Sequence, residues 1–98
     1  MMQRDFNVYY SEEAQADLLK AVRWYNGINS TLGKRLKREI KNVEKQILLN
    51  PAFASIKYRN IRTVACKVFP YSIHYEIDVD KSQILIISIF HFNKEPIQ

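Results

Sequence analysis

The spacing of the apolar residues changes once along this chain, and this change constrains the fold more than any other feature. In the first half, apolar side chains recur every three or four positions, as on a helix that buries one face. Ser11 is suited to cap a first helix ending at Asn26-Gly27, and Asn29 or Ser30 to cap a second helix ending at Asn50-Pro51. Because few residues join the two helices, we expect an antiparallel helical hairpin.

The other apolar segments follow the spacing of strands. They predict a first strand at residues 6–10, a second at 61–69, a third at 72–77 and a fourth at 84–92. The fourth is apolar at nearly every position, so we expect a central strand that is covered on both faces. The last three strands should form an antiparallel meander. If the helical hairpin is a crossover, the first strand lies beside the last.

Together these elements predict an α+β fold in which the helical hairpin packs on one face of a small antiparallel sheet, in the order β-α-α-β-β-β. The opposite face of the sheet would remain at least partly open. Residues 1–98 fit a single domain, because two glycines and three prolines leave little room for a linker.

Several classes of site are not supported by the sequence. Cys66 is the only cysteine, and the two histidines, His74 and His91, make a poor zinc site by themselves. We find no glycine-rich phosphate loop and no nucleophile elbow, so we expect no metal and no cofactor. The single thiol and the lack of a signal-peptide pattern predict a cytoplasmic protein. The longest apolar run is too short for a membrane span.

A positive net charge points toward acidic partners, either nucleic acid or protein. Fifteen Lys and Arg residues oppose ten Asp and Glu residues, which gives +5. If the basic and aromatic side chains of the second half project from the open sheet face, they would hold phosphates and stack on bases. The same residue types can also supply the acid, the base and the cations for metal-free RNA cleavage. These residues are Lys57, Tyr58, Arg59, Arg62, Lys67, Tyr71, His74, His91 and Lys94.

Each of these candidates also has a purely structural interpretation. His74 alternates with apolar neighbours and fits a solvated outer position, and His91 fits a hydrogen-bonded structural histidine. Arg62 fits a charge at a sheet edge, and Tyr71 fits a side chain that packs the bend at Pro70. The Lys and Arg residues of the second helix fit a solvated face.

The segment from residue 62 to residue 96 resembles the C-terminal half of the RelE/ParE toxin superfamily, especially its ParE-like branch. The opening strand and helix, with Tyr9-Tyr10-Ser11-Glu12-Glu13-Ala14, also look like that family, so the resemblance covers nearly the whole chain. The matching features in the second half are Arg62, Phe69-Pro70-Tyr71, Tyr75, the acidic turn at 78–80, the apolar strand at 84–89, and residues 91–96.

The resemblance implies a toxin that a cognate antitoxin neutralises. ParE-like members inhibit DNA gyrase, RelE-like members cut mRNA on the ribosome, and many relatives are known only as plasmid stabilisation proteins. We expect the antitoxin to bind apolar grooves beside the first helix, at Leu18, Val22 and Tyr25. Self-association of the toxin is left open.

Three functions follow from the resemblance. The first is gyrase inhibition by direct binding, which is favoured because no tyrosine follows His91 and the basic position is Lys94 rather than arginine. Its contacts would be Arg59, Arg62, Tyr71, His74, His91 and Lys94. The second is a ribosome-dependent mRNA endonuclease that uses Arg62, Lys67, Tyr71, His74, His91 or Lys94. The third is an inactive module that only pairs with an antitoxin.

Overall fold

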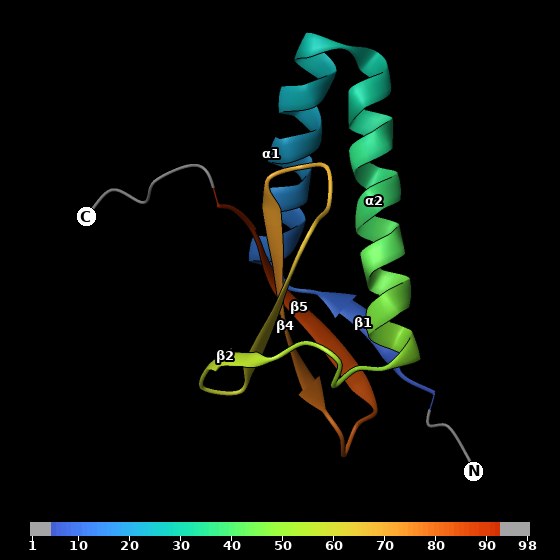
Figure 1. Cartoon of the computed structure of the whole chain (residues 1–98), viewed down its shortest axis with the longest axis vertical. Helices are drawn as coiled ribbons and strands as arrows, with labels where there is room; N and C mark the ends of the chain where they lie inside the picture. Colours follow the sequence, from blue (N-terminus) through green and yellow to red (C-terminus); the bar gives the residue numbers. More distant parts are fainter. Residues whose placement is uncertain (1–4, 93–98) are drawn as a thin grey trace.

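Two long helices stand against one face of a five-stranded sheet in the computed structural model, which describes residues 5–92 (Figure 1). The helices are α1 (Glu12–Ile28) and α2 (Ser30–Leu49). The strands are β1 (Asn7–Tyr10), β2 (Ile56–Tyr58), β3 (Ile61–Ala65), β4 (Tyr71–Asp78) and β5 (Gln83–His91).

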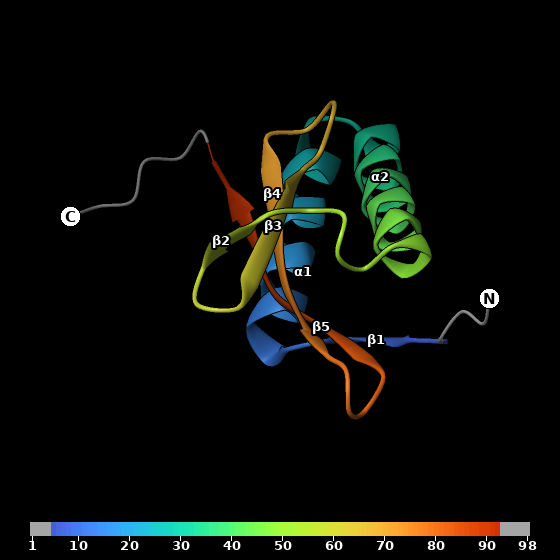
Figure 2. The ribbon, with the colours of Figure 1, turned by 60° about the horizontal axis from the view of Figure 1, so that its bottom comes forward.

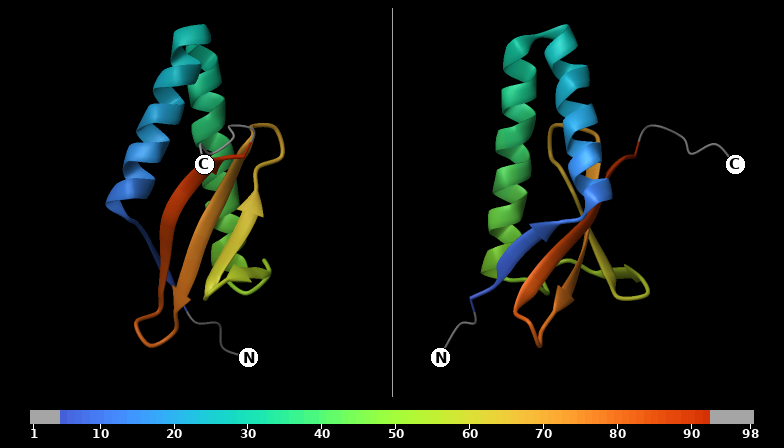
Figure 3. Two further views of the ribbon diagram at one scale, coloured as in Figure 1. Left: turned by 90° about the vertical axis from the view of Figure 1, so that its left-hand side faces the viewer. Right: turned by 180° about the vertical axis from the view of Figure 1, so that it is seen from behind.

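The sheet has the strand order β1-β5-β4-β3-β2. The predicted α+β fold is confirmed, and β1 lies beside β5 as expected. This pair runs parallel because the α1–α2 hairpin carries the chain back to the same end of the sheet, so the sheet is mixed rather than wholly antiparallel (Figures 2 and 3). The remaining neighbours pair antiparallel. Strand β2 was not predicted, since its three residues are all exposed and carry no alternation.

Asn29 joins the two helices by serving both of them. Its backbone N–H donates to the Tyr25 carbonyl at the end of α1, while its side-chain Oδ1 accepts from the Thr31 N–H at the start of α2, at 2.8 Å. Helix α1 therefore continues past the predicted end at Asn26-Gly27 and ends at Ile28. The predicted cap at Ser11 is confirmed by a 3.0 Å hydrogen bond from the Ala14 N–H.

The tip of the hairpin projects beyond the sheet (Figure 1). Within the hairpin, Gly33 of α2 lies against Asn26 of α1 so closely that a Cβ atom at residue 33 would stand 2.0 Å from the Asn26 Oδ1. This contact explains a glycine inside a helix, where it otherwise costs stability.

The core fills the space between the helices and the sheet. Its largest fully buried side chains come from α2, β4 and β5. Tyr75 is 0% exposed, and its hydroxyl donates to the Pro51 carbonyl at 2.7 Å, so the buried polar group is satisfied. The largest fully buried side chains of the core are those of Leu36, Ile47, Ile73, Tyr75, Ile84 and Ile86. No helix in the described ranges is both long and apolar enough to cross a membrane.

Two sequence predictions about the strands are corrected by the structure. Strand β5 is not covered on both faces, because Ile84, Ile86 and Ile89 are buried under the helices while Phe90 on the other side is 41% exposed. Strand β3 ends at Ala65 rather than at residue 69. Residues 66–70 instead form a loop whose backbone N–H groups bond to a side chain of α2, as described below.

Ile47 and Leu49, two residues apart on α2, test whether this interface holds the fold together. Ile47 is fully buried, so Ile47→Ala should lower the free energy of unfolding by roughly 2 to 5 kcal/mol. Leu49 is 73% exposed, so Leu49→Ala should change it by less than about 0.5 kcal/mol. Urea unfolding monitored by circular dichroism measures both, and equal losses would contradict the described packing.

Candidate functional site

Three aromatic side chains cross the face of the sheet that lies away from the helices, which we call the open face. They are Tyr58 of β2, His74 of β4 and Phe90 of β5. The Tyr58 and His74 ring centroids lie 6.1 Å apart, and those of His74 and Phe90 lie 6.0 Å apart. Tyr58 and Phe90 are 47% and 41% exposed, so this aromatic row is accessible to another molecule.

A β-bulge determines which side chains of β5 reach the open face. Between His74 and Tyr75, the partner on β5 jumps from Ser88 to Ile86. The extra residue, Ile87, lets both Ile86 and Ile89 face the core. Ser88 and Phe90 then share the open face with His74.

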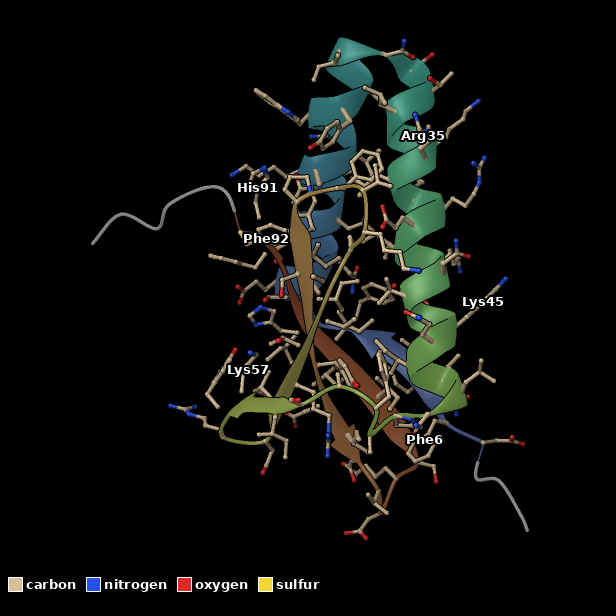
Figure 4. All side chains as sticks on the ribbon, viewed as in Figure 1. Phe6, Arg35, Lys45, Lys57, His91 and Phe92 are labelled. Atoms are coloured by element: carbon tan, nitrogen blue, oxygen red, sulfur yellow. The ribbon has the colours of Figure 1, made fainter. Side chains whose placement is uncertain are left out.

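The His74 ring contacts the Tyr58 hydroxyl, and burial favours the neutral form of the ring. Its Nδ1 lies 3.2 Å from the Tyr58 hydroxyl, and burial lowers the pKa of His74 below its usual value. Arg59 follows Tyr58 in the turn between β2 and β3, where its backbone has a positive φ of 49°. Arg59 and Lys57 are exposed, so they place positive charge beside the aromatic row at the β2 edge (Figure 4).

Arg62 does not lie on the open face, although it was expected to project there with the other basic and aromatic residues of the second half. It pairs in register with the buried Tyr75. Its Nη1 donates to the carbonyls of Ala52, at 3.2 Å, and Ala54, at 2.6 Å. Arg62 therefore ties the segment after α2 to β3, which is a structural use of the guanidinium that the sequence did not reveal.

Tyr71 is also directed away from the open face. It is 6% exposed and packs edge-on against Tyr25, with the ring centroids 6.4 Å apart, and burial raises its pKa. His91 pairs with it across β4 and β5, at a centroid distance of 4.9 Å, and the His91 Nδ1 is buried without a hydrogen-bond partner. Tyr71 and His91 are thus brought together, but beneath α1.

The residues expected for RNA cleavage do not meet in one place within the described chain. Arg62 is bonded to backbone carbonyls, Tyr71 and His91 lie under α1, and Lys67 is exposed in the loop between β3 and β4. Lys94 lies outside the described residues. The described part also contains no group of three or more His, Cys, Asp and Glu side chains placed to hold a metal ion.

A groove of about 640 Å³ runs between α1 and the end of β5. Trp24, which is 65% exposed, lines it from α1, and Phe90 and His91 line it from β5. Figure 4 labels His91. Lys20 and Arg23 also line the groove. Glu13 and Asp17 line it as well, so it is an aromatic cleft that carries charges of both signs.

The three residues expected to bind an antitoxin face inward instead. Val22 is 7% exposed, and Leu18 and Tyr25 pack against the core. The stripe that identified them is the stripe a helix buries, so it marks the core rather than an outer groove. Trp24 is 65% exposed and lines the groove, but it was not among the predicted binding residues. The sequence signal that could have identified Trp24 is its position, because a large aromatic residue stands there on the polar side of the predicted helix.

The low pKa of His74 predicts a loss of stability in acid. The unfolded chain binds a proton on this ring near pH 6.5, whereas the folded protein resists protonation until lower pH. The stability that depends on the neutral ring is therefore present above that pH and is lost as the pH falls toward the folded pKa. The urea midpoint should drop between about pH 7.5 and about pH 5, and His74→Gln should reduce that drop. An equal drop in both proteins would contradict this.

Comparison with known proteins places this geometry in a family. Residues 8–96 match the family model described as ParE toxin of type II toxin–antitoxin system, parDE. A chain of the "Chromosomal ParDE TA system from P. aeruginosa" superposes with a TM-score of 0.75 at 15% identity, covering 89% of this chain and 96% of that chain. A chain of the "intact E. coli RelBE toxin-antitoxin complex" gives 0.59 at 21% identity, covering 93% and 99%.

No curated protein matches the sequence. The two solved structures share the fold with this chain. The family match spans nearly the whole described sequence, and it agrees with the resemblance of residues 62–96. This chain therefore belongs to the ParE toxin family of type II toxin–antitoxin systems.

Proposed function

We propose that this ParE toxin inhibits DNA gyrase by binding it directly, and that the open face makes the contact. The observation that carries the proposal is where the aromatic and polar side chains lie relative to the open face. Accessible aromatic side chains gather on the open face together with His74, while three other groups that a nuclease would use, Arg62, Tyr71 and His91, lie away from that face. A cytoplasmic location, where gyrase is found, belongs to the same proposal.

The open face has the composition of a protein-binding surface. Tyrosine, other aromatic residues and arginine contribute most to binding when they are centred in an interface. Tyr58, His74 and Phe90 form the row, and Arg59 stands at its edge. Because Tyr58 and His74 already touch, little side-chain freedom is lost when a partner covers them.

Cleavage of RNA is disfavoured by the chemistry of the same residues. A general base must reach the proton it removes, and its pKa should lie near the working pH. Burial raises the pKa of Tyr71 further from neutrality, and the Arg62 Nη1 is already engaged by two carbonyls. The mRNA endonuclease remains the second candidate, because the fold also matches a chain of the RelBE complex.

The antitoxin partner is proposed to occupy the groove between α1 and β5. Both similar structures come from toxin–antitoxin systems, and this groove, at about 640 Å³, has room for side chains of a partner segment. Its aromatic walls suit an apolar side chain, while Lys20 and Arg23 can meet acidic residues of the partner and Glu13 and Asp17 can meet basic ones.

A supercoiling assay tests the gyrase proposal. The purified toxin should inhibit gyrase, and a combined Arg59→Ala and His74→Ala variant should need about thirtyfold more protein for the same effect, because each of the two contacts in an interface centre is worth about 1 kcal/mol. Lys45→Ala, an exposed change on α2, should behave like the unaltered toxin.

Three results would contradict the gyrase proposal. Gyrase that stays active at a large excess of toxin would remove it. Cleavage of mRNA in stalled ribosomes, detected by toeprinting, would support the endonuclease instead. Unimpaired growth when the toxin is expressed without antitoxin would support the inactive module.

Direct binding of the antitoxin to toxin variants tests the groove. Trp24→Ala should weaken binding of the antitoxin encoded beside the toxin by about tenfold or more, since an exposed tryptophan is a typical anchor of an interface. Leu19→Ala is the matched control, because Leu19 is 52% exposed on the same helix but does not line the groove. Isothermal titration measures both variants, and equal affinities would refute this location.

A further inference from the structure

The loop between β3 and β4 bonds to a carboxylate through consecutive backbone groups. The N–H groups of Lys67 and Val68 donate to Oε2 of Glu39, the latter at 3.0 Å, and the Phe69 N–H donates to Oε1 at 3.4 Å. Such a run of N–H groups forms an anion-binding nest. Burial, and then the charge of Glu39, raise the pKa of the neighbouring Cys66 thiol to about 12, so the loop supplies no thiolate.

A pocket of about 380 Å³ lies beside this nest, between α2 and the loop. Arg35, which Figure 4 labels on α2, contributes to its lining with Arg38 and Lys67. None of these three side chains has an ion-pair partner among residues 5–92. Three cations stand next to the single carboxylate of Glu39, so the pocket carries an excess of positive charge. Elsewhere on α2, Glu44 is engaged by a different group, since it accepts a hydrogen bond from the Tyr10 hydroxyl at 2.8 Å.

The pocket also has an apolar wall. Val68 is 68% exposed at the rim of the loop, while Val43 and Phe69 lie deeper. An exposed valine beside unpaired arginines fits a ligand that carries both a charge and a short apolar group. This mixture separates the pocket from a surface that only tracks phosphates, where apolar area contributes little.

We propose that this pocket binds an acidic side chain of a peptide segment from a protein partner. The carboxylate bonds to Arg35, Arg38 and Lys67, and a neighbouring apolar residue of the peptide packs on Val68. A carboxylate on a peptide is favoured over a free phosphate because the pocket also offers the apolar wall of Val68, which an apolar neighbour in the peptide can cover. The site lies on the α2 side of the loop, and it is separate from the α1–β5 groove and from the open face.

Direct binding of short peptides to the full chain tests the proposal. The probe is an acetylated peptide amide of alternating glutamate and leucine, and its control replaces each glutamate with glutamine. The combined Arg35→Gln and Arg38→Gln variant should weaken binding of the glutamate peptide at least about tenfold, because a charge-assisted hydrogen bond typically contributes about that factor. The matched control, Lys41→Gln with Lys45→Gln, removes the same charge from exposed positions of α2 outside the pocket.

Two further arms separate this proposal from its alternatives. The amide resonances of Lys67, Val68 and Phe69 should shift on titration with the glutamate peptide and stay in place with the glutamine peptide. Equal weakening by both pairs of substitutions would overturn the proposal, since it would show attraction by net charge alone. Absence of binding at millimolar peptide would also overturn it. Duplex DNA or inorganic phosphate binding more tightly, with the same dependence on Arg35 and Arg38, would assign the pocket to phosphate instead.

None of these measurements involves gyrase or the antitoxin. Failure of the pocket proposal therefore leaves the proposed function untouched, and failure of gyrase inhibition leaves the pocket proposal in place.

Discussion

The burial of one sheet face beneath two helices determines which side chains this toxin can present to another molecule. Helix α2 and strands β4 and β5 close around Tyr75, which has no exposed surface and donates its hydroxyl to the Pro51 carbonyl. Every second residue of β4 is then committed to the core, and the residues between them are left for the open face. The bulge at Ile87 extends the same division along β5.

Similar residue types consequently have different uses on the two sides of the sheet. Tyr71 and His91 touch beneath α1, where burial raises the pKa of the tyrosine and leaves the histidine Nδ1 without a partner. Tyr58 and His74 also touch, but on the open face, where the tyrosine is accessible. The first pair belongs to the support of the fold and to one wall of a groove. The second pair is placed to meet a partner.

Local sequence signals were sufficient for the parts of the fold that depend on neighbouring residues. Ser11 caps α1 and Asn50 ends α2 as predicted, because caps and proline act within a few positions. The inward position of Tyr71 was also available from the sequence, since it shares the parity of Ile73 and Tyr75, but the strand was predicted to begin only at residue 72. The end of β3 was not available, because Glu39, distant in sequence, bonds to the loop that follows Ala65. The carbonyls that engage Arg62 likewise become adjacent only after folding.

Footprinting of the toxin in complex with gyrase tests the central claim most directly, because it reports which side chains a partner covers. Radical labelling with mass spectrometry should detect Tyr58 and Phe90 in the free toxin, and gyrase should protect both of them. Tyr75 should remain unlabelled in either state, since it is fully buried. Protection confined to α2, with the open face labelled equally in both states, would contradict the account.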